Sequence, residues 1–163
     1  MSDGGAGADG PGLTVRPLAA GDEAEWRRLW TAYLTFYETS VSEAVYRTTW
    51  ARLLSRGPGE YRGLLAHAPD PAGGEGPALG LAHYLFHRHC WHAADVVYLQ
   101  DLYVDETARG AGAGRALIEA VYGAADDAGA ANVYWLTQDF NAEARRLYDR
   151  IGSETPFIKY NRR

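Results

Sequence analysis

Apolar side chains recur at helical spacing in the first third of the chain. Between Asp22 and Glu38 they repeat every three or four residues, which predicts an amphipathic helix with one buried face. Ser40 and Glu43 have the spacing of a capping box and predict the start of a second helix, which ends before Gly57. The apolar positions of the first helix are Trp26, Leu29, Trp30, Tyr33, Leu34 and Tyr37.

Shorter apolar runs, rich in β-branched and aromatic residues, predict strands. The expected strands cover Leu13–Leu18, Arg62–Ala68, Ala78–His87, Tyr98–Val104, Asn132–Gln138 and Thr155–Tyr160. Pro69–Pro77 is expected to be a loop.

A third helix ending near Gly129 and a fourth over Asn141–Ile151 follow the fourth strand. The third helix makes the strands on either side of it parallel, whereas the shorter connections before it favour antiparallel pairs. The pattern predicts an α/β (α+β) domain with a mixed sheet.

Length and composition narrow the class of protein. The 163 residues fit one domain, assigned to residues 13–163, and residues 1–12 lack the apolar side chains that would order them, so they are expected to be a disordered tail. The net charge of −5 argues against a nucleic-acid surface and is compatible with cationic substrates. No apolar run is long enough to span a membrane. The lone Cys90 and the absence of a secretion signal predict a cytoplasmic protein.

A glycine-rich turn links the fourth strand to the third helix. Arg109, Gly110, Gly112 and Gly114 stand where that helix should begin, so unpaired N–H groups and the positive end of the helix dipole meet there. Glycine lets an anion approach the backbone closely, and arginine pairs with phosphate oxygens. The turn therefore predicts a phosphate site. It is neither a P-loop, which requires Gly-Lys-Ser/Thr, nor a dinucleotide turn, whose third glycine is replaced by Arg115.

The spacing that remains is Arg-x-x-Gly-x-Gly, formed by Arg109, Gly112 and Gly114. The downstream residues that accompany it are Trp135, Thr137, Asn141 and Tyr148. Together they resemble the cofactor motif of the GCN5-related N-acetyltransferases (GNAT), and most closely its diamine and D-amino-acid acetyltransferases with their fungal relatives that also acetylate histones. The resemblance implies a mixed sheet of about six or seven strands, about four helices on both faces, and central parallel strands that splay apart.

The resemblance also implies how acetyl-coenzyme A, the co-substrate, would be bound. Backbone groups of the splayed strand would bind the pantetheine arm, the glycine-rich turn would hold the pyrophosphate, and Asn141 would hydrogen-bond the pantetheine. The implied contacts are Leu102, Tyr103, Val104, Arg109, Gly110, Ala111, Gly112, Ala113, Gly114, Arg115 and Asn141. Tyr148 matches the family tyrosine beside the coenzyme A sulfur, where its phenol would act as the general acid that protonates the leaving thiolate.

The general base has several candidates. An alkyl amine, with a pKa of about 10.4, must lose a proton to attack a thioester. Diamine acetyltransferases carry a glutamate immediately before the aspartate of this strand, and here that position is Gln100, which cannot accept the proton. The alternatives are Asp101 acting through water, Glu38, and a water chain with no single base.

Tyr33, Tyr37, Glu38 and Gln100 are candidate contacts for the acceptor, because tyrosines beside a carboxylate can hold a cation. The alternative is that the aromatic residues belong to the core or to a dimer interface. A histidine-rich stretch consists of His87, His89, Cys90 and His92. It has no second set of ligands elsewhere in the sequence, so no metal is expected.

These features predict an acetyl-coenzyme A-dependent N-acetyltransferase that acts on the primary amine of a small molecule, such as a polyamine or an amino acid. Direct transfer within a ternary complex is expected, because Cys90 lies off the motif and no other residue is placed as an acyl-enzyme nucleophile. Two alternatives remain: an enzyme acting on protein lysines or N-termini, and a non-enzymatic acyl-coenzyme A sensor, which would not need Tyr148. The resemblance further implies a homodimer, with no nucleic-acid or membrane partner.

Overall fold

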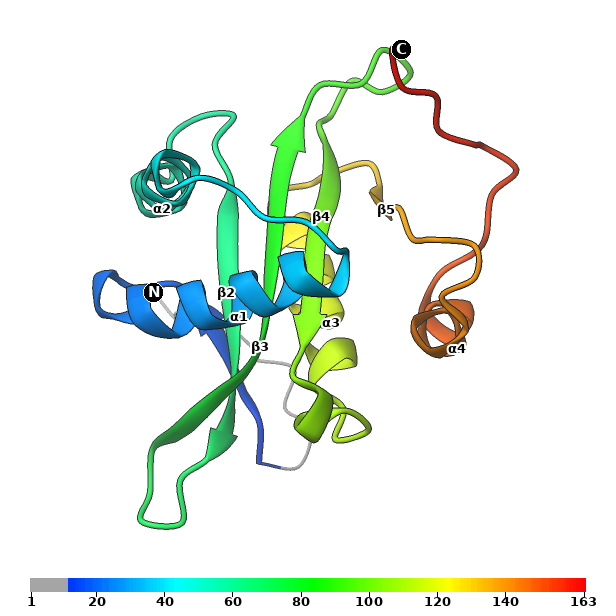
Figure 1. Ribbon diagram of the computed structural model, residues 1–163. Helices are drawn as coiled ribbons and strands as arrows, with labels where there is room; N and C mark the ends of the chain where they lie inside the picture. Colours follow the sequence, from blue (N-terminus) through cyan, green and yellow to red (C-terminus); the bar gives the residue numbers. More distant parts are fainter. Residues whose placement is uncertain (1–11) are drawn as a thin grey trace.

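The computed structural model describes residues 12–163, so the tail expected over residues 1–12 lies, apart from Gly12, outside the described residues. A central sheet is flanked by helices on both sides (Figure 1). The strands are β1 (Thr14–Pro17), β2 (Arg62–Pro69), β3 (Glu75–His87), β4 (Val96–Val104) and β5 (Val133–Trp135). The helices are α1 (Glu23–Phe36), α2 (Glu43–Ser55), α3 (Ala113–Asp127) and α4 (Ala142–Ile151), with short 3₁₀ turns η1 (Ala20–Asp22) and η2 (Glu106–Ala108).

Within residues 12–163 the sheet has five strands in the order β1-β2-β3-β4-β5. Neighbouring strands are antiparallel except for β4 and β5, which α3 connects and which run parallel. Helices α1 and α2 bury their aromatic faces on one side of the sheet, and α3 and α4 pack on the other. The mixed sheet with helices on both faces is confirmed.

One extra residue in β4 forms a β-bulge. Leu99 pairs with Tyr84 and Asp101 pairs with His83, so Gln100 between them has no partner in β3. Such a residue bends the strand and inverts the alternation of side chains and backbone groups beyond it.

The inversion can be followed in the backbone hydrogen bonds on either side of the bulge. Val97 donates its N–H to Asn132, next to β5, whereas Asp105 donates to Leu79, next to β3, each at 2.8 Å. In a regular strand, the N–H groups of two residues eight positions apart would point toward the same neighbouring strand. After the bulge, the N–H and C=O groups of Leu102 and Val104 therefore face the β5 side.

The β5 side offers these groups no partner strand, because the pairing of β4 with β5 ends at Leu99 and Trp135. The implied splay of the central parallel strands is confirmed. It also explains why the fifth strand is shorter than the expected Asn132–Gln138: once β4 bends away at Gln100, residues after Trp135 have no ladder to join.

The strand expected over Thr155–Tyr160 is wrong, and the total of about six or seven strands is corrected to five within residues 12–163. The segment after α4 runs free of the sheet (Figure 1). Its apolar side chains Phe157, Ile158 and Tyr160 are 76–87% exposed. A strand forms only where a neighbour takes up its N–H and C=O groups, and this segment has none within the described chain.

Two elements have other bounds in the structure than the sequence predicts. The N-cap of α2 is Ser42 rather than Ser40, and its hydroxyl accepts from the Val45 N–H at 3.4 Å, while Glu43 is already helical. The loop expected over Pro69–Pro77 is shorter, because β3 begins at Glu75 and pairs there with Pro69.

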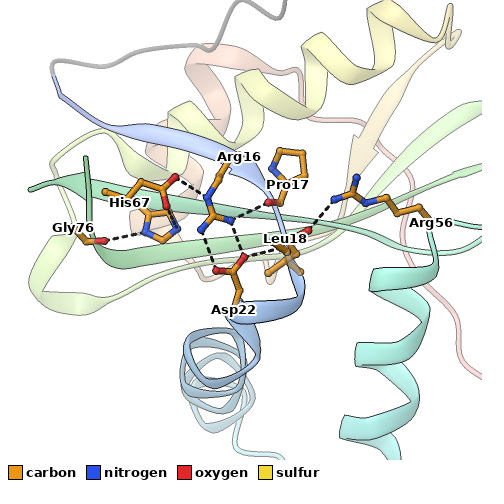
Figure 2. Close-up of polar contacts among 9 residues, drawn as sticks. Arg16, Pro17, Leu18, Asp22, Arg56, His67 and Gly76 are labelled. Atoms are coloured by element: carbon orange, nitrogen blue, oxygen red, sulfur yellow. Dashed lines mark hydrogen bonds and ion pairs between the residues drawn. The ribbon is translucent and has the colours of Figure 1, made fainter. Parts of the chain in front are cut away.

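A polar cluster around Arg16 joins the first strand to the rest of the sheet (Figure 2). The Arg16 guanidinium bonds Asp22 at 2.7 Å and Glu75 at 2.6 Å, and the bond from Arg16 holds the pKa of Asp22 below its usual range. Nearby, the His67 ring lies 3.0 Å from the Gly76 carbonyl oxygen, and Arg56 donates to the Leu18 carbonyl. The cluster links β1 to β3 and to the start of α1, which is a structural role.

Gly80 in β3 lies where β4 comes closest, and Gly80→Ala should destabilise the fold by about 1–3 kcal/mol. A Cβ at this position would meet the Tyr103 carbonyl oxygen at 2.6 Å, and backbone of a central strand cannot move aside cheaply. Gly123→Ala, on the exposed side of α3, is the matched control: its Cβ meets nothing within 4 Å, and it should stabilise by about 0.5–1 kcal/mol. Urea unfolding measures both; equal midpoints for the two variants would contradict the packing argument.

Candidate active site

The glycine-rich turn leaves an open space at the N-terminus of α3. Gly110 and Gly112 have φ angles of 83° and 89°, and a Cβ added to either would meet no atom within 4 Å. The first helical hydrogen bond is made by Ala116, to the Gly112 carbonyl, so the N–H groups of residues 112–115 have no helical partner. The first turn of α3 holds no acidic residue. The positive end of this helix is therefore available to an anion, as the sequence predicts.

The two arginines of the turn are held by neighbouring groups. Arg109 donates to the Val104 carbonyl oxygen at 3.3 Å and lies 3.4 Å from a Glu143 carboxylate oxygen, and its guanidinium is 5.7 Å from the Phe36 ring. It thereby joins the turn to β4, α4 and α1. Arg115 pairs with Glu119, one turn further along α3, at 2.7 Å. Both arginines would have to share their guanidinium groups between these carboxylates and a phosphate.

A small cleft opens between the splayed strands. Its lining comes from α1, β4, β5 and α4, and consists of Tyr33, Tyr37, Leu99, Gln100, Leu102, Trp135, Leu136 and Tyr148. The structure thus brings together most of the residues that the sequence singled out for the acetyl group and the acceptor. Tyr103 does not line this cleft; its side chain packs with the α1 cluster, where its ring centroid lies 6.5 Å from that of Tyr33.

Tyr148 is positioned by aromatic packing at the C-terminal half of α4. Its ring meets the Trp135 ring edge-on at a centroid distance of 5.4 Å. Gly152 makes room for this pair, because a Cβ there would lie 2.7 Å from the Trp135 ring. Burial, helped by the nearby Tyr37, raises the pKa of Tyr148 to about 12, so its phenol keeps its proton at neutral pH.

Asn141 caps the start of α4. Its side-chain oxygen accepts from the Ala144 N–H at 3.3 Å, and its amide NH₂ group remains free to donate. The expected contact of Asn141 with pantetheine would use that donor.

The two carboxylates named as candidate bases lie outside the cleft lining. Glu38 is exposed, with a φ of 54°, just after the end of α1. Asp101 is buried on the α1 face of the sheet, because the bulge at Gln100 places it on the face opposite to that of Leu99. Its carboxylate lies 2.9 Å from His83 Nδ1, and Trp30 donates to it at 3.3 Å.

Sequence reasoning missed His83. It stands among apolar residues within an expected strand, and no motif marks it. Only the register of β3 against β4, with the bulge opposite it, pairs His83 with Asp101. A polar residue in an otherwise apolar buried strand was the one available signal.

Two further observations concern residues 12–163. No group of three or more histidine, cysteine, aspartate or glutamate side chains is arranged there to hold a metal ion. None of the helices in this range combines the length and apolar character that a membrane span requires.

The chain matches known acetyltransferases. A family model described as "Acetyltransferase (GNAT) family" matches residues 25–152. The D-amino-acid N-acetyltransferase HPA3 of Saccharomyces cerevisiae is 39% identical over 150 residues, which cover 92% of this chain and 90% of the yeast protein.

Solved structures show the same fold at low sequence identity. AAC(6′)-Iy, bound to a bisubstrate analogue of coenzyme A and acetylneamine, has a TM-score of 0.77 at 17% identity, covering 93% of this chain and 97% of that one. A ribosomal-protein-alanine N-acetyltransferase from Brucella melitensis has a TM-score of 0.72 at 17% identity, covering 93% and 98%.

Proposed function

The chain belongs to the acetyltransferase (GNAT) family, and we propose that it transfers the acetyl group of acetyl-coenzyme A to the primary amine of a small molecule. One observation carries this proposal. The backbone groups of Leu102 and Val104, left without a partner strand by the bulge at Gln100, face the side of β4 on which Tyr148 lines the cleft. Backbone N–H groups that can bind the acetyl carbonyl oxygen thus lie on the same side as a phenol that can protonate the leaving thiolate.

The residues of the turn fit the phosphates of coenzyme A. The open space at Gly110 and Gly112 and the acid-free start of α3 suit a pyrophosphate, and Arg109 and Arg115 add positive charge. We assign pyrophosphate binding to residues 109–115, and pantetheine binding to the backbone of residues 102–104 and the Asn141 amide. Coenzyme A supplies the activated acetyl thioester, and Tyr148 Oη donates the proton that its sulfur takes on leaving.

The cleft favours an acceptor that arrives as a cation. Tyr33, Tyr37 and Gln100 line it, and no basic side chain does so within the described chain. Burial raises the pKa of the Tyr37 phenol, and the nearby Asp101 charge adds to the effect, so the hydroxyl stays protonated and can bind the amine. D-amino acids are the first class to test, because the yeast relative is named for them.

The test is the release of free thiol from acetyl-coenzyme A in the presence of D-amino acids, L-amino acids, polyamines, aminoglycosides and a histone-tail peptide. We expect turnover with one class of small amine. A preference for the peptide would instead favour the protein acetyltransferase. Calorimetric binding of coenzyme A without turnover on any amine would overturn the enzymatic proposal.

We also propose a cytoplasmic location, because the thiol of Cys90 is free and exposed.

We further propose a homodimer formed through the C-terminal segment. Phe157, Ile158 and Tyr160 expose apolar surface, and β5 is an edge strand of the described sheet. Exposed apolar side chains and an open strand edge are each typical of an interface. We place the C-terminal segment of the second copy along this edge.

The double change Phe157→Asp and Ile158→Asp should convert the dimer to a monomer, because each charge would have to be buried at the interface. Light scattering after size exclusion measures the mass. Val45→Asp, which places the same charge at an exposed apolar position of α2, should leave the dimer intact. A monomeric unmodified protein, or a double variant that still dimerises, would contradict the proposal.

A further inference from the structure

The outer end of the cleft is bordered by apolar side chains that are exposed to solvent. Leu136, which lines the cleft from the segment after β5, is 53% exposed. On the α1 side, Phe36 is 46% exposed and meets the ring of Tyr37, itself part of the lining, at a centroid distance of 5.1 Å. Single exposed apolar residues are common on protein surfaces, but two that border one cleft form a surface that suits an apolar ligand.

Three aromatic rings at the end of α1 connect the interior of the cleft to this outer end. Tyr33 meets Tyr37 edge-on at a centroid distance of 5.0 Å, and Tyr37 in turn meets Phe36 edge-on. Tyr33 and Tyr37 line the cleft, and Phe36 continues the row to the surface. We call these three residues the α1 aromatic row. It offers apolar surface to a ligand over a longer stretch than an amine alone would cover.

The reacting amine belongs at the inner end of the cleft, where the proposed function places the acetyl group beside Leu102 and Tyr148. Leu99 closes this end, because it is 2% exposed and its pair with Trp135 is the last one between β4 and β5. The part of the acceptor beyond its amine must therefore extend outward, past Leu136 and the α1 aromatic row. The side chains that it meets on the way are mainly apolar.

The lining offers no partner for a charge on the body of the acceptor. Within the described chain its side chains are those of tyrosine, tryptophan, leucine and one glutamine, Gln100. The phenols and this amide can bind the reacting amine, and a carboxylate on the same carbon, by hydrogen bonds. A second ammonium group or a side-chain carboxylate would lose its water there without meeting an opposite charge. At the outer end the Arg109 guanidinium, 5.7 Å from the Phe36 ring, would repel a second cation.

We propose that the acceptor is a primary amine whose body is apolar, such as an arylalkylamine or an amino acid with an apolar side chain, and that Leu136 and Phe36 determine this specificity. The inference rests on the proposed function and narrows its class of substrate. Leu136 contacts the body of the acceptor from the β5 side, and the α1 aromatic row contacts it from the α1 side. Polyamines are poor acceptors, because their second ammonium group has no partner in the lining.

Two matched pairs of acceptors test the class of substrate. Butylamine and diaminobutane have similar lengths and differ at one end, where a methyl group stands against an ammonium group. D-leucine and D-asparagine have nearly the same shape and differ in the polarity of the side chain. In each pair, kcat/KM should be at least about tenfold higher for the apolar member. Equal values within the pairs, or a preference for the polar members, would overturn the inference while the proposed function stands.

The substitution Leu136→Ser tests the exposed leucine. It should lower kcat/KM about tenfold for phenylethylamine but less than about twofold for ethylamine, which has the same amine and no ring to contact Leu136. Val45→Ser is the matched control, because it removes an exposed apolar side chain of α2 outside the lining and should change neither value. Equal losses with the two amines would overturn the role of Leu136, as would loss of the dimer in Leu136→Ser, which would assign the leucine to the subunit interface.

The substitution Phe36→Ala tests the other side of the cleft. It should lower kcat/KM for phenylethylamine at least about threefold and leave the value for ethylamine nearly unchanged. Because Arg109 lies against the Phe36 ring, calorimetric titration with coenzyme A shows whether a loss comes from the coenzyme instead. A preference for diaminobutane that disappears in Glu38→Gln would assign the outer end to the exposed Glu38 carboxylate and overturn the inference. Absence of turnover by the unmodified protein on every amine would overturn the proposed function itself, and this inference with it.

Discussion

Replacing Tyr148 with phenylalanine should lower kcat about 100-fold, while coenzyme A affinity stays within about twofold. The phenol is the one proton donor in the described lining whose ring is fixed from behind by Trp135, and phenylalanine keeps that packing. What it removes is the proton needed by the leaving sulfur. Steady-state turnover and calorimetric binding, measured on the same preparation, separate the two effects.

The control for this substitution is Tyr134→Phe on β5, because it also removes a tyrosine hydroxyl, here one that bonds His87 at 2.8 Å outside the cleft lining. It should leave kcat nearly unchanged. A Tyr148→Phe variant with normal turnover would remove Tyr148 from the mechanism. Loss of coenzyme affinity alone would show that the tyrosine binds rather than protonates.

The pH dependence provides an independent check on the same acid. A general acid must be protonated to act, and Tyr148, with a pKa raised to about 12, loses its proton only as the pH rises toward that value. The kcat of the unmodified protein should therefore show no fall caused by this group between about pH 7 and about pH 10. The ascending limb at lower pH reports the groups that take the amine proton.

The parts of this site that sequence could predict are those made by neighbouring residues. The turn around Gly112, a helix starting at about Asn141 and the helical position of Tyr148 all follow from local spacing, and the structure has each of them, with Asn141 itself as the N-cap. Local chemistry decides such features, because a helix N-terminus or a cap is built from residues a few positions apart.

The parts that sequence could not predict depend on which strands lie next to each other. The bulge at Gln100 decides that Asp101 faces α1 and His83, and nothing in either strand alone reports it. The strand expected over Thr155–Tyr160 has the right apolar pattern but no neighbour within the described chain. A pattern of period two states which residues could share a face, and only pairing makes the strand.

Gly112→Asp should weaken coenzyme A binding by at least about 100-fold, or roughly 2.7 kcal/mol. The side chain would enter the open space above the turn and set a carboxylate against the phosphates that the α3 N-terminus attracts. The φ of 89° at this position adds strain for any residue other than glycine. Calorimetric titration with coenzyme A measures the loss directly, without reference to any acceptor.

Two variants divide this loss between charge, strain and filled space. Gly112→Asn fills the same space without the charge and tolerates the left-handed backbone better than most residues, so it should lose less affinity than Gly112→Asp. Gly123→Asp puts the same charge on the exposed side of the same helix, about 16 Å along its axis, and should bind normally. The three variants differ from the unmodified protein in one side chain each. Normal binding by Gly112→Asp would therefore show that the phosphates lie elsewhere, and that the proposed orientation of the coenzyme along β4 is wrong.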